Sequence, residues 1–194
     1  MTLVVGLGNP GSDYADTRHN AGWWVVERLV RRWGAEPGER RTEYRTWQGT
    51  FRGHRVTLLQ PLTFMNLSGE AVALWRETHG LELAELMVIA DDVYLPVGHL
   101  RLRASGGSGG HRGLDSLERS LGTREYTRLR FGVGTTVADR LREHVLDAPP
   151  ADELAVLERA TVEAAETVEC WLAEGVIVAM NRINRKVPKE VSEP

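Results

Sequence analysis

Residues 3–11 of the chain read LVVGLGNPG, and this stretch decides the fold. Its apolar start predicts a short buried strand, and its glycines predict a loop directly after that strand. His19 and Asn20 follow, just before apolar residues that recur with helical spacing at 21–33. In open α/β sheets, functional sites form at the carboxyl ends of the strands. We therefore expect Asn9 and His19 to lie at a catalytic pocket.

The composition is that of one globular domain. The chain has 194 residues, of which 42% are hydrophobic, enough to bury a full core. The formal net charge of −3 predicts no polyanionic partner, so any basic surface must be local. Arginines gather between residues 99 and 130, and acidic residues gather between residues 152 and 169. We expect one basic and one acidic face, which together can orient an anionic ligand.

Cysteine content and hydropathy exclude several classes of protein. Cys170 is the single cysteine, which excludes an internal disulfide and gives no metal-ligand spacing. We expect it to be a packed thiol, because free cysteines are commonly buried. The sequence shows no apolar run of membrane length and no signal peptide. We therefore expect a cytoplasmic protein with no membrane attachment.

Hydrophobic periodicity predicts a single α/β domain with a twisted mixed β-sheet flanked by helices. The continuously apolar run at residues 86–90 is typical of a central strand covered on both faces. We expect the domain to span residues 1–184 and to be followed by a flexible polar tail at residues 185–194. The predicted strands are 3–7, 43–51, 54–60, 86–90, 99–103 and 128–133, and the predicted helices are 21–33, 67–79, 114–121, 138–145 and 151–181.

His19 and Asp91 are candidates for a catalytic pair. An acid at the end of a central apolar strand is costly to bury unless it is paired, and an imidazole N–H is a common partner. The carboxylate would fix the tautomer of His19 and leave its other nitrogen free to take a proton from water. Because successive strand residues point to opposite faces, we expect only one of Asp91 and Asp92 to face the pocket. A lone His at a helix start is more often a capping or packing residue, so the case for His19 depends on Asp91.

Two asparagines near the predicted helix starts could be helix caps or site residues. Asn20 is a plausible N-cap for the helix at 21–33, and Asn66 or Ser68 for the helix at 67–79. Asn66 could instead donate its amide to a substrate oxygen. These two roles compete for one side chain, and the spacing does not choose between them.

Glycine-rich segments suggest nucleotide sites that the surrounding sequence does not support. Residues 6–11 match GxGxxG, but no helix opens within the motif and no acid ends a second strand about twenty residues later. Residues 106–113 lack the Lys-Ser/Thr ending of a P-loop. This flexible loop carries His111 and Arg112, so it is better suited to bind a nucleic-acid phosphate than a nucleotide triphosphate. The alternative is an ordinary solvated loop between a strand and a helix. Residues 106–110, GGSGG, match the letters of GxSxG, but they lie in a long loop rather than in the sharp strand-to-helix turn of a serine esterase.

Taken together, these motifs resemble bacterial-type peptidyl-tRNA hydrolase, from residue 4 to about residue 184. The resemblance implies a monomeric single-domain fold that needs no metal, cofactor or protein partner. The implied reaction is cleavage of the ester between a peptide and the terminal ribose of tRNA, which recycles tRNA after aborted translation. The matching blocks are VVGLGNPGSDYADTRHNAGW at 4–23, QPLTFMNLSGEAV at 60–72, VIADDVYLP at 88–96, GGSGGHRGL at 106–114 and RLRFGVG at 128–134.

The resemblance also implies roles for single residues. His19 corresponds to the catalytic base and Asp91 to its orienting acid, while Asn9 and Asn66 correspond to carboxamides that bind the substrate and stabilise the oxyanion. Of the two, we expect Asn66 to donate to the oxyanion, with Asn9 as the alternative donor. The implied cleft around the acceptor end and the peptide comprises Tyr14, Phe64, Met65, Gly109, Gly110, His111 and Arg112. The implied contacts to tRNA phosphates are Arg103 and Arg130, and Arg101, which precedes the glycine-rich loop, is a third candidate.

This sequence departs from the family pattern at three positions. Arg112 stands where many relatives have Asn, Tyr94 replaces a common acid and Ser108 replaces a common His. Arg112 therefore cannot make an amide contact, but it can add a phosphate contact. An alternative function is that of a non-catalytic RNA-binding protein on the same fold, although His19, Asp91 and both candidate asparagines are present.

Overall fold

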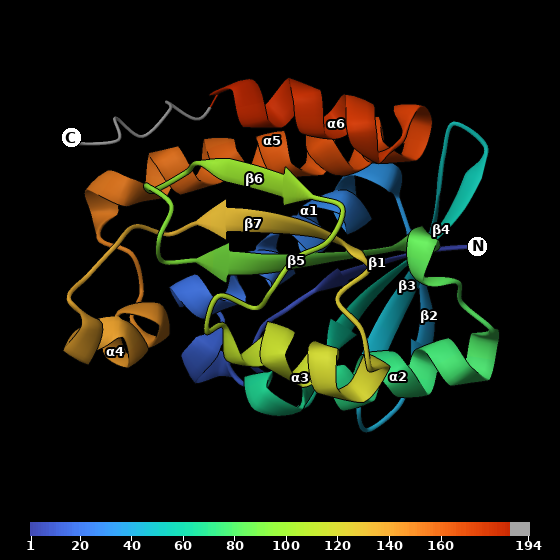
Figure 1. The fold of residues 1–194 in the computed structure, drawn as a ribbon, viewed down its shortest axis with the longest axis horizontal. Helices are drawn as coiled ribbons and strands as arrows, with labels where there is room; N and C mark the ends of the chain where they lie inside the picture. Colours follow the sequence, from blue (N-terminus) through green and yellow to red (C-terminus); the bar gives the residue numbers. More distant parts are fainter. Residues whose placement is uncertain (187–194) are drawn as a thin grey trace.

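The structure is a computed structural model in which residues 1–186 are described. Seven strands form one mixed sheet in the order β2-β3-β4-β1-β5-β7-β6 (Figure 1). β1, β4, β5 and β7 run parallel, whereas β2, β3 and β6 are added by antiparallel pairing. The strands are β1 Thr2–Gly6, β2 Glu36–Arg40, β3 Tyr44–Phe51, β4 His54–Pro61, β5 Leu86–Asp92, β6 Leu100–Arg103 and β7 Thr127–Gly132.

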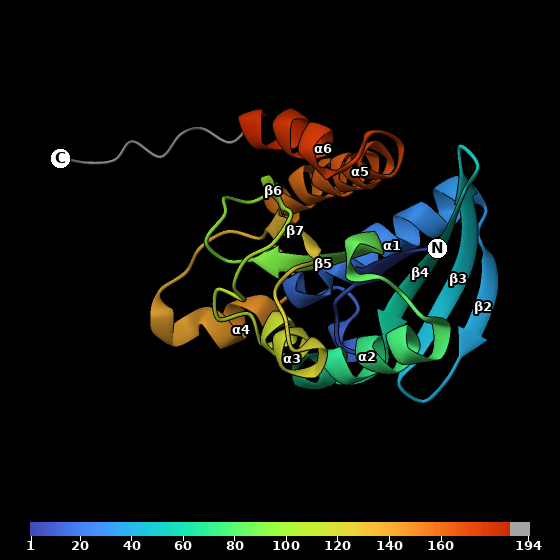
Figure 2. The ribbon, with the colours of Figure 1, turned by 45° about the vertical axis from the view of Figure 1, so that its right-hand side comes forward.

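Helices cover both faces of the sheet. The helices are α1 Ala21–Trp33, α2 Ser68–His79, α3 Arg112–Leu121, α4 Leu141–Leu146, α5 Ala151–Glu174 and α6 Val176–Ile183. One core cluster joins the sheet to α1, α5 and α6, and the other joins it to α2 and α3. Figure 2 shows the same layers turned by 45°, and Figure 1 shows α4 at the lower left, beside the strand ends. The fold is therefore a single α/β domain with a mixed sheet, as the sequence predicts.

The central strand β5 is buried along its whole length. Met87 and Ile89 pack in the cluster with α1 and α5, whereas Val88 and Ala90 pack in the cluster with α2 and α3. This two-sided burial explains why the run is continuously apolar. β5 ends in two buried acids, so charged groups are carried into the interior at the carboxyl edge of the sheet.

Glycine allows α1 to approach the sheet through its backbone. A Cβ on Gly22 would lie 2.5 Å from the carbonyl oxygen of Ile89, and one on Gly6 would lie 2.2 Å from the carbonyl oxygen of Gly22. No side chain other than hydrogen fits between these backbones. The first turn of α1 is thus held against β1 and β5, which fixes the segment that precedes it.

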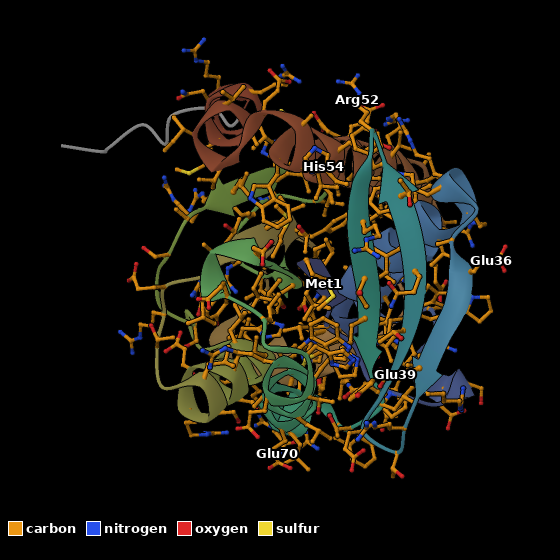
Figure 3. All side chains as sticks on the ribbon, turned by 90° about the vertical axis from the view of Figure 1, so that its right-hand side faces the viewer. Met1, Glu36, Glu39, Arg52, His54 and Glu70 are labelled. Carbon is orange, nitrogen blue, oxygen red and sulfur yellow. The ribbon has the colours of Figure 1, made fainter. Side chains whose placement is uncertain are left out.

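The two edges of the sheet differ. The Asn184 carboxamide pairs with the Leu102 backbone of β6, accepting from its N–H at 2.9 Å and donating to its C=O at 3.0 Å. The opposite edge strand, β2, is exposed along its length and contains Pro37, which disfavours pairing with another chain. Figure 3 shows Glu36 and Glu39 on β2, and Arg52 and His54 at the tip of the neighbouring hairpin.

Several sequence predictions differ from the structure. Strand β2 is absent from them, because Gly34 and Pro37 indicate only the end of a helix. The predicted helix at 151–181 is two helices, separated at Gly175, whose φ is 83°. None of the expected caps forms: neither Asn20 nor the residues around the start of α2 donate or accept a side-chain capping bond. Of the predicted tail, residues 187–194 lie outside the described residues.

We expect Gly22→Ala to destabilise the protein strongly. The added methyl would overlap the backbone of Ile89 in β5 and of Leu7, directly after β1, and such overpacking costs about 1–3 kcal/mol or more. The measurement is the free energy of unfolding from urea titration. Gly107→Ala is the matched control, because a Cβ there meets no atom within 4 Å. Equal unfolding free energies for the two variants would contradict the close approach.

Candidate active site

A cleft of about 660 Å³ opens at the carboxyl ends of the parallel strands. In Figure 1 the arrowheads of β5 and β7 mark this edge of the sheet, with α4 beside it. The loop after β1, the start of α2, the end of β5, the start of α3 and helix α4 all contribute walls. Its lining includes the sequence-predicted residues Asn9, Tyr14, His19, Phe64, Met65, Asn66, Asp91, Gly109, Gly110, His111, Arg112 and Arg130.

His19 and Asp91 meet at the base of the cleft. His19 lies in the short 3-10 turn Arg18–Asn20, just before α1. Its Nδ1 is 2.8 Å from Asp91 Oδ1, and both side chains are buried. Because a carboxylate only accepts, Nδ1 carries the proton and donates. Nε2 is then the basic nitrogen, and it has no hydrogen-bond partner among the described residues.

His111 is a second imidazole on the same carboxylate oxygen. Its Nε2 is 2.8 Å from Asp91 Oδ1. Its Nδ1 accepts from the backbone N–H groups of Gly113 at 3.1 Å and Leu114 at 3.3 Å, so His111 caps α3. These contacts assign the proton to Nε2. Burial lowers the pKa of the His111 imidazole, which therefore stays a neutral donor to Asp91.

Asp91 remains ionised in this environment. Burial alone would raise the pKa of its carboxyl group, but the imidazoles of His19 and His111 hold that pKa well below its ordinary value. The two imidazole N–H donors compensate the cost of burying the charge. The array thus keeps a fixed negative charge beside His19, which can stabilise an imidazolium there.

The same three groups have the composition of a metal site, and their donor atoms lie within 4.8 Å of one another. A metal bound at Nε2 of His111 would require the ring proton to be on Nδ1. That nitrogen already faces the N–H groups of Gly113 and Leu114, which would then meet a third donor. The geometry therefore disfavours His111 as a metal ligand.

Asn9 is held rigidly in the cleft wall. Its Oδ1 accepts from the backbone N–H of Met65 at 2.8 Å, which leaves Nδ2 as the free group. Asn20 fixes the backbone of Asn9 on both sides: it accepts from the Asn9 N–H at 2.8 Å and donates to the Asn9 carbonyl at 3.1 Å. Asn20 is therefore a positioning residue rather than the predicted helix cap. Its adjacency to His19 is the only sequence signal for this role.

Asn66 also lines the cleft, but no hydrogen bond to a described residue fixes its side chain. Its side chain is exposed and makes no hydrogen bond to any described residue. It does not cap α2, so that alternative is wrong. Its amide is available to a ligand in the cleft.

Asp92 also lines the cleft, which corrects the expectation that only one of the two acids would do so. Its Oδ2 is 3.2 Å from Arg130 Nε, and its Oδ1 accepts from the backbone N–H of Tyr94 at 2.9 Å. Arg130 also donates to the carbonyl of Ser108 at 2.8 Å and is only 8% exposed. Asp92 and Arg130 therefore join the end of β5 to the glycine-rich loop. The opposite-face rule fails because the strand ends here and both faces open into one cleft.

The rim of the cleft is more exposed than its base. Phe64 and Tyr94 are 58% and 64% exposed. Arg112 is exposed at the start of α3 and has no ion pair among the described residues. Arg101 and Arg103 lie outside the cleft on β6, where Arg103 pairs with Arg128, near the amino end of β7.

Comparisons with known proteins agree with this geometry. Residues 3–191 match the family described as Peptidyl-tRNA hydrolase. A Synechococcus sp. (strain JA-2-3B'a(2-13)) protein of that name is 44% identical, covering 100% of this chain and 86% of its own. One from Syntrophomonas wolfei is 42% identical, covering 95% of this chain and 100% of its own. A crystal structure of peptidyl-tRNA hydrolase from Acinetobacter baumannii superposes with a TM-score of 0.90 at 35% identity, covering 97% of this chain and 96% of that one.

Proposed function

The chain belongs to the peptidyl-tRNA hydrolase family and hydrolyses peptidyl-tRNA, and we propose that His19 activates the attacking water. One observation carries the assignment of His19. Its Nδ1 is fixed by the buried Asp91 carboxylate at 2.8 Å, while its Nε2 faces the cleft without a partner among the described residues. An imidazole oriented in this way is a general base.

The proposed reaction needs no protein nucleophile. His19 Nε2 takes a proton from water as the water oxygen bonds to the ester carbonyl carbon, and a tetrahedral intermediate forms. Asp91 stabilises the imidazolium. When the intermediate collapses, the bond from the carbonyl carbon to the ribose oxygen breaks, and that oxygen receives the proton from His19. General-base assistance of this kind contributes roughly 10²- to 10⁴-fold.

Asn9 and Asn66 are the proposed donors to the oxyanion and to the bound substrate. Asn9 Nδ2 is free because Met65 N–H holds the other end of the amide, so this donor is already oriented. A preorganised donor stabilises a developing charge without reorganising. Asn66 can follow the substrate, because nothing in the described chain fixes its side chain. We therefore propose Asn9 rather than Asn66, the residue expected from the sequence, as the main oxyanion donor, and we expect Asn66 to contribute more to binding.

The walls of the cleft suit the two parts of the substrate. We propose that the apolar and aromatic side chains bind the peptide and the acceptor end: Tyr14, Phe64 and Met65. Gly109, Gly110, His111 and Arg112 are proposed to form the opposite lip. Arg101, Arg103 and Arg130 are proposed to contact tRNA phosphates, as the resemblance implies.

We further propose a cytoplasmic monomer that acts without a protein partner. One chain provides every wall of the cleft, and the substrate is a product of translation. None of the helices in residues 1–186 combines the length and the apolar character needed to cross a membrane.

We expect His19→Ala to lower single-turnover hydrolysis of an N-blocked aminoacyl-tRNA by about 10²- to 10⁴-fold, with EDTA present throughout. The control is His54→Ala, at the exposed hairpin tip, which should match wild type. Wild-type inactivity with intact tRNA binding would instead favour the non-catalytic RNA-binding alternative. Full activity of the His19 variant would refute the assignment of the base.

Substitution of the two asparagines separates their roles. We expect Asn9→Ala to lower kcat by roughly 10²- to 10³-fold, because a preorganised oxyanion donor is removed. Asn66→Ala should mainly raise KM, which is the signature of an interaction made equally in the ground and transition states. The measurement is steady-state kinetics over a range of substrate concentrations. A larger fall in kcat for the Asn66 variant would reverse the two assignments.

Salt dependence tests the phosphate contacts. We expect Arg103→Ala to reduce the slope of log K against log salt for tRNA binding by about 0.7–0.9 for each phosphate that the arginine neutralises. Arg52→Ala is the matched control, because Arg52 is exposed at the tip of the β3–β4 hairpin, on the other half of the sheet from β6. An unchanged slope in the Arg103 variant would remove that residue from the interface.

A further inference from the structure

Helix α4 forms one wall of the cleft, and its position depends on contacts with other parts of the chain. Leu141, Arg142, Val145 and Leu146 line the cleft together with His19. The helix has six residues, and none of them is fully buried. A helix this short is not stable in isolation, so its position must come from contacts with the rest of the chain.

Arg18 supplies several of these contacts. The residue is only 6% exposed although it precedes His19 in the same turn. Nη1 donates to the carbonyl oxygens of His144 at 3.4 Å, Asp147 at 3.4 Å and Ala148 at 3.3 Å. The Arg18 backbone N–H also donates to the Asp147 carbonyl, at 3.3 Å. A cation therefore satisfies carbonyls at the C-terminal end of α4, where they have no partner within the helix.

Glu153 holds the other side of the guanidinium. Its Oε2 accepts from Arg18 Nη2 at 2.9 Å, and it lies in the first turn of α5. The Glu153 side chain is 26% exposed, so this ion pair is partly shielded from solvent. Glu153 thereby fixes the guanidinium that holds α4, without contacting the cleft itself.

His144 attaches α4 at a second point. Its Nε2 is 3.1 Å from the carbonyl oxygen of Val133 and 3.0 Å from that of Gly134, so this nitrogen carries a proton and donates to both. These carbonyls directly follow β7. Arg18 is thus the attachment on the His19 side of α4, and His144 is the attachment on the side of the sheet.

We propose that Arg18 and Glu153 are positioning residues that hold α4 as the wall against which the peptide of the substrate packs. This proposal rests on the proposed function. Three of the α4 side chains in the cleft are apolar, which suits peptide side chains rather than phosphates. Because Arg18 and His19 are consecutive, the same backbone turn sets both the wall and the catalytic imidazole. Release of α4 therefore weakens peptide binding while the His19–Asp91 pair remains intact.

Glu153→Gln tests this arrangement. The variant keeps a hydrogen-bond acceptor but removes the charge, and its site is outside the cleft. If α4 leaves its position part of the time, only the molecules with α4 in place bind the peptide well. The apparent affinity for the substrate is then reduced in proportion to the fraction of molecules in which α4 is in place. We expect KM for an N-blocked aminoacyl-tRNA with a large apolar side chain to rise about threefold to tenfold, with kcat within about twofold of wild type. Arg18→Lys should raise KM further, because a lysine ammonium cannot replace the planar guanidinium that bonds to α4 and to Glu153 at the same time.

Hydrogen–deuterium exchange gives a readout that does not depend on catalysis. We expect amide exchange in residues 141–148 to accelerate in Glu153→Gln by at least about threefold, while exchange in α1 stays unchanged. The matched control is Glu158→Gln, which removes another carboxylate of α5 that is paired with an arginine, Arg28, away from the cleft. Unchanged exchange at α4, equal effects of the two variants, or a fall in kcat at constant KM would each overturn the proposal. Inactivity of the wild type would count against the proposed function alone.

Discussion

The structure depends on one buried charge, the carboxylate of Asp91 at the end of the central strand. A charge at this depth persists only if donors replace the water that burial removes. His19 and His111 supply those donors from segments far apart in the chain, each at 2.8 Å from the same oxygen. The loop before α1 and the loop before α3 must both close over the strand end to do so. The cleft is the space that remains between these loops.

The two imidazoles on that carboxylate are not equivalent, because their outer nitrogens meet different surroundings. Nδ1 of His111 is saturated by the backbone N–H groups at the start of α3, so the ring can neither accept another proton easily nor turn. Nε2 of His19 has no such partner in the described chain and faces the cleft. One ring is thus a structural donor and the other an available base. Helix capping, an ordinary folding interaction, makes this distinction.

The sequence predicts the interactions that are local or periodic and misses those that depend on tertiary contact. The apolar run of β5 and the helical spacing of α1 are enough to place Asp91 and His19 at one edge of the sheet. Local propensity assigns Asn20 to a helix cap, because it cannot show that the amide reaches the backbone of Asn9. The bond from His111 to Asp91 is likewise invisible in the sequence, because it depends on how a glycine-rich loop folds over the sheet. Strand β2 is missed because Pro37 resembles a loop residue, although proline is acceptable at an exposed edge.

The turn Arg18–Asn20 shows how few residues are needed to organise such a site. A 3-10 helix has about three residues per turn, so successive side chains point about 120° apart. Arg18 reaches α4 and α5, His19 reaches β5, and Asn20 reaches the loop that carries Asn9. All three side chains are buried. The turn is itself held by α1, whose glycine at position 22 lets the helix rest directly on the sheet backbone. The position of the proposed catalytic base, the orientation of the proposed amide donor and the place of the outer wall therefore all depend on one short segment.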